Sequence, residues 1–369
     1  MLVELEPHPH ARAVLAPALA ADGQPSHAYL FHGPGGAGKR AVARAVASEL
    51  LAAGSDRPGS ARARVLSGAH PDLTWVSPSG AHEILVSDID EPVVAASSRT
   101  PFESLRRVFV IESVDELGDE AANRMLKTLE EPASFVHLIL ITDRLTEVLP
   151  TIRSRCQLVR FDAPRIDQVA ASLSELGVAA ETALACARLS LGDADRAREL
   201  AAAEGVALRE AGERLARAAI AGKVAEQKPW APLLTAVKAR GDITRAELEG
   251  RAAAEVELYP RKERKRIETE WNDRLRRVRR RGETSALDLA LQMASLWFTD
   301  LACLAWGADD LVRHADRKAE LAEDHGPGPQ QLRAAIELVE DARQRLQFNV
   351  TEELACEALA YRLERVLSL

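Results

Sequence analysis

The sequence predicts an α/β domain built on a parallel sheet, followed by a small helical segment and an all-α C-terminal domain. Between residues 28 and 160, short runs of β-branched and aromatic residues alternate with helical patterns. From about residue 165 onward, almost only the 3.6-residue period of helices is present. Only 7 Phe, 5 Trp and 3 Tyr occur among 369 residues, so Ala, Leu and Val must fill most of the core. That composition favours helices over β-sandwiches.

Five strands are predicted in the α/β domain. Each is a short apolar run, and consecutive runs are separated by enough chain for a crossover connection. This spacing is typical of a parallel sheet that helices cover on both faces. The predicted strands span residues 28–32, 73–76, 108–111, 136–141 and 156–160.

The length of the chain accommodates two or three domains, which we place at residues 1–164, 165–207 and 208–369. The first is the α/β domain, the second a helical lid, and the third a helical collar that oligomerises. Gly177 and Gly192 are expected to end helices of the lid. Beyond residue 208 we expect helices that are interrupted where Gly or Pro occurs, at 228–232, 241–242, 282 and 325–329.

Composition excludes several classes of protein. The net charge of −8 gives the molecule as a whole no electrostatic reason to bind nucleic acid, so any DNA contact must be local. The four cysteines lie far apart without a C-x-x-C pair, which argues against a zinc ribbon or a disulfide framework. The N-terminus lacks the pattern of a signal peptide, and no run approaches the roughly 20 apolar residues of a membrane span. We therefore expect a soluble cytoplasmic protein with no membrane contact.

A basic segment stands out at residues 261–281. It contains eleven Arg or Lys against four Asp or Glu, a local net charge of +7. Trp271, Leu275 and Val278 recur at helical spacing, which favours a solvated amphipathic helix whose apolar side faces a partner. A DNA-facing surface is the alternative.

A glycine-rich loop directly follows the first predicted strand. Gly33, Gly38 and Lys39 satisfy the G-x-x-x-x-G-K spacing, and an Ala-rich helix over residues 41–51 comes next. Glycines let backbone N–H groups converge on phosphate oxygens, the helix N-terminus adds its dipole, and the lysine reaches the terminal phosphates. The sequence therefore predicts a loop of phosphate-binding ancestry.

Two features of this region depart from a hydrolytic site. The residue after Lys39 should be Ser or Thr, whose hydroxyl binds Mg²⁺, but here it is Arg40, which has no lone pair for a metal and would repel it. The third strand should be followed by Asp and Glu, but Glu112 and Ser113 stand there, and a serine cannot serve as the general base. We therefore expect magnesium-dependent hydrolysis to be compromised.

Three later signatures carry a resemblance to a known family. They are N-R-M-L-K-T-L-E-E-P at residues 123–132, a strand that closes on Thr142, and L-P-T-I-R-S-R-C at residues 149–156. In this order they resemble closely the clamp-loader branch of the AAA+ family. The likeness covers residues 25–165, is weaker in the lid, and beyond residue 208 depends on helical character and on the stretch 346–350.

His70-Pro71-Asp72 is similar to the H-P-D that follows a zinc module in such subunits. The four cysteines of that module have no counterpart between residues 51 and 69. Zinc is therefore not expected.

The resemblance implies roles for individual residues. Subunits of the delta-prime type in bacterial DNA polymerase III combine a retired ATPase site with an intact S-R-C, as this chain does. Arg155 is then an arginine finger that enters a neighbour's nucleotide site and stabilises charge on the γ-phosphate. From the residues alone, Arg155 could instead pair with a surface acid, and Thr142, at the sensor position, could instead cap a turn. The implied, degenerate nucleotide-binding set is Gly33, Gly38, Lys39, Arg40, Glu112, Ser113 and Thr142.

The resemblance also implies a function and partners. It predicts a non-hydrolysing subunit that helps to load a sliding clamp on primed DNA in replication. Its partners would be motor subunits of the gamma/tau type and a clamp-opening delta subunit, and, through the complex, the sliding clamp and primer–template DNA. No intrinsic ATPase and no required cofactor is expected, although ATP or ADP could still occupy the loop. The alternatives are an ATP-hydrolysing motor subunit or other AAA+ ATPase, and a nucleic-acid-binding module organised around residues 261–281.

Overall fold

A computed structural model describes residues 3–20, 22–80, 83–258, 260–324, 326–346 and 351–368, so that most of the stretch 346–350 lies outside the described residues. The chain divides into two compact units, Met1–Pro164 and Arg165–Leu369. Each unit encloses hydrophobic clusters of its own. The two units are therefore described separately.

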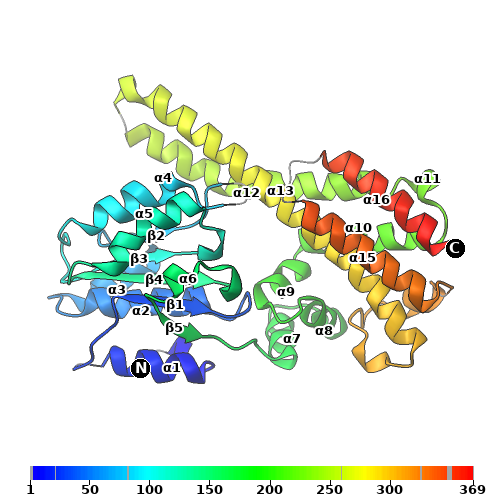
Figure 1. Cartoon of the computed structure of the whole chain (residues 1–369), viewed down its shortest axis with the longest axis horizontal. Coiled ribbons are helices and arrows are strands. Elements are labelled where there is room, and N and C mark those ends of the chain that lie inside the picture. Colours follow the sequence, from blue (N-terminus) through cyan, green and yellow to red (C-terminus); the bar gives the residue numbers. More distant parts are fainter. Residues whose placement is uncertain are drawn as a thin grey trace. The chain divides into compact units, whose positions relative to one another are not determined.

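The first unit is built on one five-stranded sheet with the strand order β2-β3-β4-β1-β5 (Figure 1). Every pairing between neighbouring strands is parallel. The five predicted strands and the parallel sheet are confirmed, with ends that shift by at most one residue. The strands are β1 (Ala28–His32), β2 (Leu73–Val76), β3 (Arg107–Ile111), β4 (Val136–Thr142) and β5 (Gln157–Arg160).

Helices cover both faces of this sheet. In β3, Val108 and Val110 belong to one hydrophobic cluster, while Phe109 and Ile111 belong to another, because successive side chains of a strand point to opposite faces. Helices α1, α2 and α3 contribute to the first cluster, and helices α4, α5 and α6 to the second. Their bounds are α1 (Pro9–Ala18), α2 (Lys39–Ala52), α3 (Pro58–Ser67), α4 (Val86–Ile89), α5 (Asp119–Glu130) and α6 (Pro150–Arg153).

The second unit is helical throughout the residues that the structure describes. Gly177 and Gly192, with φ values of 91° and 92°, follow the ends of α7 and α8, as predicted. One hydrophobic cluster extends from Val169 to Leu367, so the predicted lid and collar share a core. The helices are α7 (Ile166–Glu175), α8 (Ala180–Leu189), α9 (Ala194–Ala201), α10 (Ala203–Ile220), α11 (Val224–Gln227), α12 (Trp230–Leu258), α13 (Arg261–Ala305), α14 (Lys318–Glu323), α15 (Pro329–Arg345) and α16 (Glu352–Leu367).

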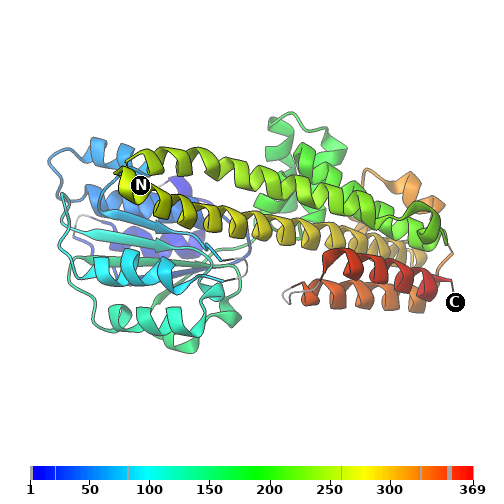
Figure 2. The ribbon, with the colours of Figure 1, turned by 90° about the horizontal axis from the view of Figure 1, so that it is seen from above.

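Helices α12 and α13 form a long hairpin (Figure 2). The helix breaks predicted at Gly241–Asp242 and at Gly282 are wrong, because both positions lie inside continuous helices. A Cβ on Gly282 would lie 2.9 Å from Oγ1 of Thr244, and a Cβ on Gly241 would lie 2.5 Å from Cγ of Glu283. These glycines therefore allow the two helices to approach closely. The predicted breaks near 228–232 and 325–329 are confirmed, since helices end and restart there.

Among the described residues, α13 alone is long and apolar enough to cross a membrane by length and composition. This differs from the expectation that no such segment occurs. Its apolar window is 72% buried inside the structure, and Trp297 and Phe298 are almost completely buried. Such burial is typical of a helix in a protein core.

Candidate functional site

The glycine loop connects the carboxyl end of β1 to the first residue of α2. In the sheet, His32 of β1 lies beside Thr142 of β4, and Ile111 of β3 lies beside Leu140 of β4. The carboxyl ends of these three parallel strands therefore meet at one edge of the sheet. The structure places the whole predicted nucleotide-binding set at this edge: Gly33, Gly38, Lys39, Arg40, Glu112, Ser113 and Thr142.

Two glycines of the loop are required by its shape. Gly33 has a φ of 144° and Gly38 a φ of 77°, in the region that other residues rarely adopt. A Cβ on Gly33 would lie 2.2 Å from the carbonyl oxygen of Phe161, and a Cβ on Gly38 would lie 3.1 Å from Nε2 of His8. The loop conformation predicted from the spacing therefore depends on glycine at both positions.

Lys39 points into its own loop. The residue is only 4% exposed, and its Nζ donates to the carbonyl oxygens of Gly33, at 2.7 Å, and of Pro34. It also pairs with the Asp143 carboxylate at 2.8 Å. These acceptors match the three donors of an ammonium group. A phosphate that binds Lys39 would have to displace Asp143, whose side chain is 57% exposed.

Arg40 and Glu112, the two residues that depart from the sequence pattern of a metal-dependent hydrolytic site, form an ion pair. Nε of Arg40 lies 3.0 Å from Oε1 of Glu112. Glu112 is buried, and it also accepts hydrogen bonds from Nε1 of Trp75 at 2.8 Å and from Oγ of Ser77 at 3.2 Å. Its carboxylate is therefore held by three groups of this chain, and the cation beside it is a guanidinium. These residues do not fit Mg²⁺.

Ser113 lies in the turn that follows β3, and Thr142 is the last residue of β4. Ser113 has a φ of 51°. Thr142, which is 1% exposed, donates through Oγ1 to Asp115 at 2.7 Å and accepts from the backbone N–H of Arg144 at 2.9 Å. Asp115 also binds the guanidinium of Arg144 at 3.0 Å. The threonine hydroxyl thus holds the turn after β4, and its sensor role remains a prediction.

Histidines beside the loop were not assigned to it from the sequence. Burial lowers the pKa of His32, and the positive charges of His10 and Lys39 lower it further. Burial also lowers the pKa of His8, which lies against Gly38. No spacing marks His8, because its position arises from α1 packing beside β5, a contact between segments far apart in the chain.

Asp143 and Asp115 are the other two residues that the sequence reasoning missed. Asp143 follows the last residue of β4, and Asp115 comes four residues after the end of β3. One sequence feature could have identified them: each is an acidic residue shortly after the carboxyl end of a strand, and the two strands are adjacent and parallel. The pairing of each acid with its particular partner is set by the tertiary structure.

Arg155 lies at the opposite edge of the sheet. It precedes β5, whose first residue, Gln157, lies beside Tyr29 near the start of β1. The rise of about 3.3 Å per strand residue separates this level from the glycine loop by roughly 10 Å or more. The predicted finger and the predicted loop are therefore not brought together within this chain.

The observed hydrogen-bond and ion-pair partners of the Arg155 guanidinium all belong to residues at the protein surface. Its Nη1 donates to the carbonyl oxygen of Thr151 at 2.8 Å and to Oγ of Ser154 at 3.3 Å, and its Nη2 pairs with the Glu130 carboxylate. The side chains of Arg155 and Glu130 are 34% and 47% exposed. An exposed pair of this kind contributes roughly 0–1 kcal/mol, so it is readily exchanged for another anion.

Metal-binding groups and reactive thiols are the remaining chemical candidates. Within the described ranges, no group of three or more His, Cys, Asp or Glu side chains could hold a metal ion. All four cysteines are free. Burial raises the pKa of Cys156, next to Arg155, to about 12, which keeps this thiol protonated at neutral pH.

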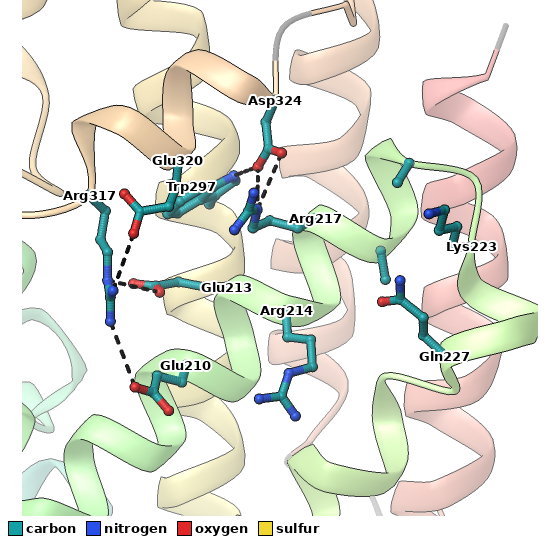
Figure 3. A pocket seen from close by; sticks show the side chains of 12 residues that line it. Glu210, Glu213, Arg214, Arg217, Lys223, Gln227, Trp297, Arg317, Glu320 and Asp324 are labelled. Atoms are coloured by element: carbon teal, nitrogen blue, oxygen red, sulfur yellow. Dashed lines mark hydrogen bonds and ion pairs between the residues drawn. The ribbon is translucent and has the colours of Figure 1, made fainter.

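A polar cavity of about 450 Å³ lies in the second unit (Figure 3). Its lining charges largely pair with one another: Arg217 binds Asp324 at 3.0 Å, and Arg317 lies 3.3 Å from Glu320. Nε1 of Trp297 also donates to Asp324, at 2.9 Å. The cavity contains none of the residues predicted for the site, and its balanced charges favour neither an anion nor a cation.

Comparison with known proteins assigns the N-terminal part of the chain. Residues 8–165 match the family model described as DNA polymerase III, delta subunit. The chain is 37% identical to DNA polymerase III subunit delta' of Pseudomonas aeruginosa, over 36% of this chain and 42% of that protein. It is 39% identical to subunit delta' of Bacillus subtilis, over 37% of this chain and 42% of that protein.

A tau subunit of DNA polymerase III is also similar to this chain. DNA polymerase III subunit tau of Bacillus subtilis is 37% identical over 38% of this chain and 25% of that protein. A solved DNA polymerase III gamma-subunit-related protein of Thermotoga maritima aligns over 97% of this chain and 99% of its own, at 13% identity and a TM-score of 0.49, too low to support an assignment.

The chain spans less than half the length of these curated relatives. The parallel sheet, the glycine loop and the later signatures all lie within residues 8–165, which match the family model. The N-terminal unit, an α/β domain with a glycine loop on a parallel sheet, is therefore similar to the delta-prime subunits of DNA polymerase III and matches the family model described as DNA polymerase III, delta subunit.

Proposed function

We propose that this chain is a non-hydrolysing clamp-loader subunit that supplies Arg155 in trans to the ATP site of a neighbouring motor subunit during DNA replication. The ion pair between Arg40 and Glu112, at 3.0 Å, carries the first half of the proposal. A guanidinium offers no lone pair to a metal, and Glu112 is already held by Trp75. We therefore assign no hydrolytic step to this chain.

The position of Arg155 supports the second half. Because the residue lies at the sheet edge away from the glycine loop, it cannot serve a nucleotide in its own loop. A phosphate group of a neighbouring subunit could replace the exposed Glu130 carboxylate. The planar guanidinium suits this exchange, since it stays charged and can bind two phosphate oxygens at once.

The proposal includes partners and a setting. The partners are motor subunits of the gamma/tau type, a clamp-opening delta subunit and, through the complex, the sliding clamp and primer–template DNA in the cytoplasm. The likeness to a tau subunit supports the first of these. ATP or ADP could bind the loop without Mg²⁺, and zinc has no part in the proposal. The lid at residues 165–207 and the collar at residues 208–369 would hold the assembly together.

The decisive experiment measures clamp- and DNA-stimulated ATP turnover of the complex rebuilt from this chain and its cognate motor and delta subunits. Arg155→Ala should slow hydrolysis at the one site that the finger reaches by about 10³-fold or more, as loss of a trans arginine does in GTPases. Total turnover should then fall by at least that site's share. Lys39→Ala should leave turnover unchanged.

Arg153→Ala is the matched control, because it removes the neighbouring arginine at the end of α6 and should have little effect. Arg155→Lys should not rescue turnover, since an ammonium lacks the planar fork. Sensitivity at Lys39 with indifference at Arg155 would overturn the proposal. So would magnesium-dependent turnover by this chain alone that Lys39→Ala abolishes, which would identify an ATP-hydrolysing subunit.

A further inference from the structure

The tip of the α12–α13 hairpin extends beyond the other helices of the second unit (Figures 1 and 2). We call residues 241–258 of α12 and 261–281 of α13 the arm. Ala252, Ile267 and Leu275 are buried between its two helices. Trp271, which is half-buried, lines a groove on the arm together with Val256. The apolar side of the basic helix predicted from the sequence therefore packs against α12, and its partner is within this chain.

The packing leaves much of the opposite side of α13 to solvent: Lys262, Lys265, Arg266 and Arg276 are exposed, while Arg277 and Arg280 are partly buried. With about 100° per residue in an α-helix, six basic side chains project within about 60° of the direction directly opposite the buried seam. A single acid, Asp273, shares that sector. The six bases are Lys262, Lys265, Arg266, Arg276, Arg277 and Arg280, which we call the basic face.

The basic face is a straight, extended feature. From Lys262 to Arg280 it covers about 27 Å at 1.5 Å per residue. Its bases form two groups, one before Glu268 and one after Asp273. By sequence, the α12 half of the arm carries five Asp or Glu and only two Arg. The positive charge of the arm is therefore concentrated in its α13 half.

Two bases of this face form only exposed ion pairs within the chain, whereas Arg280, 41% exposed, pairs with the largely buried Glu352 at 2.8 Å. Arg266 pairs with Glu270 at 2.9 Å, with both side chains more than half exposed. Arg276, 80% exposed, lies 3.8 Å from Asp273. Exposed pairs of this kind contribute roughly 0–1 kcal/mol each, so a phosphate could replace either acid at little cost. Since screening limits charge effects to about 8 Å at physiological salt, the acids elsewhere in the chain do not cancel this face.

We propose that the basic face of the arm binds the phosphate backbone of duplex DNA. Duplex DNA presents a charge about every 1.7 Å along its axis, a regular polyanion that matches a straight row of bases. A single strand would need aromatic side chains on which bases can stack. Trp271 is the one aromatic residue in 261–281, and it lies in the groove rather than on the basic face, with the Arg274 guanidinium 4.9 Å from its ring.

The choice of DNA over RNA rests on the proposed function. The binding of a duplex polyanion is argued from the residues of the arm alone. The test uses the full chain without other subunits, so its failure and that of the arginine-finger proposal are distinguishable. Fluorescence anisotropy would follow a labelled 30-base-pair duplex from 50 to 200 mM salt. The arm variant combines Lys262→Gln, Lys265→Gln, Arg276→Gln and Arg277→Gln, since glutamine is a good helix former. It should bind at least about tenfold more weakly at 50 mM salt, with a salt slope shallower by about 3 to 4, because each phosphate contact contributes about 0.9.

A control variant removes four exposed bases elsewhere on the second unit, by Lys223→Gln, Lys318→Gln, Arg333→Gln and Arg365→Gln. It has the same net charge as the arm variant, and it should bind DNA as the original chain does. Circular dichroism should show equal helix content in all three proteins. Equal losses in both variants, tighter binding of a single strand than of the duplex, or no duplex binding at 50 mM salt would each overturn the proposal. If the arm variant instead fails only to assemble with partner subunits, the arm is a protein-docking surface.

Discussion

His137 illustrates how one buried side chain sets the response of the first unit to acid. It lies in β4 and is 3% exposed. Its Nδ1–H donates to the carbonyl oxygen of Ser26 at 2.9 Å, and its ring stacks against that of His27. Burial lowers the pKa of His137 to about 4. The neutral ring is therefore the form that the folded unit holds.

The low pKa of His137 predicts a loss of stability in acid. The unfolded chain takes up the proton near pH 6.5, while the folded unit resists it until about pH 4. The contribution of neutral His137 to the free energy of unfolding is complete above pH 6.5 and disappears as the pH falls toward 4. A pKa shift of one unit corresponds to about 1.4 kcal/mol. Between pH 7 and pH 4.5, the free energy of unfolding of the original chain should therefore fall by on the order of 2 kcal/mol more than that of the His137→Gln variant. Urea unfolding at both pH values measures the two losses. Equal losses would show that His137 does not govern the response, since the other histidines are present in both proteins.

The site residues divide into those that local sequence determines and those that it does not. Gly33, Gly38 and Lys39 are predictable, because one contiguous motif places them between a strand and a helix. The sequence alone shows that Arg40 and Glu112 each differ from the residue that a hydrolytic site has at that position. Their ion pair is not predictable, since it depends on β1 and β3 ending at the same edge of the sheet. The acid that holds Lys39 reaches it from the end of β4 for the same reason.

At the scale of elements, the closest approach of α12 and α13 is set by two glycines. Gly241 and Gly282 face each other, with 3.5 Å between the Cα of Gly241 and a Cβ built on Gly282. The same Cβ would lie 3.1 Å from Cβ of Thr244, which is too close for an unstrained contact. Glycine normally weakens a helix interior, so its presence here is explained by packing.

This geometry predicts opposite effects of one substitution at two positions of the hairpin. Gly282→Ala should destabilise the second unit by about 1 kcal/mol or more, because the strain of overpacking exceeds the gain in helix propensity. Gly250→Ala is the matched control, since nothing lies within 4 Å of a Cβ there. It should stabilise the unit by up to about 1 kcal/mol. Thermal melts followed by helical circular dichroism measure both changes. If both variants gain stability, the helices are not as close as described.

Strands are predictable from this sequence because their apolar runs are short and are bounded by loops, and all five match within one residue. The lengths of the C-terminal helices are not. A glycine that ends a helix, such as Gly177, has a positive φ, whereas Gly282 keeps a helical backbone beside a close neighbour. Both positions are simply glycine in the sequence, and only the packing of the neighbouring helix distinguishes them.

At the scale of the whole molecule, the proposed activities lie in different units. The glycine loop and Arg155 belong to Met1–Pro164, and the arm belongs to Arg165–Leu369. The first unit buries two hydrophobic clusters against its sheet, and the second buries one among its helices. Each unit thus has the buried apolar surface that independent folding requires.

Separate fragments should therefore fold and keep their own functions. Residues 1–164 contain a single tryptophan, Trp75, whose Nε1 donates to Glu112, so its fluorescence reports whether the sheet has formed. Residues 165–369 should retain helical circular dichroism and bind duplex DNA with the affinity and salt slope of the full chain, whereas residues 1–164 should not bind it. Calorimetry of each fragment should show a cooperative transition. An unfolded fragment would contradict the independence of the two units, and DNA binding by residues 1–164 alone would contradict the assignment of that binding to the arm.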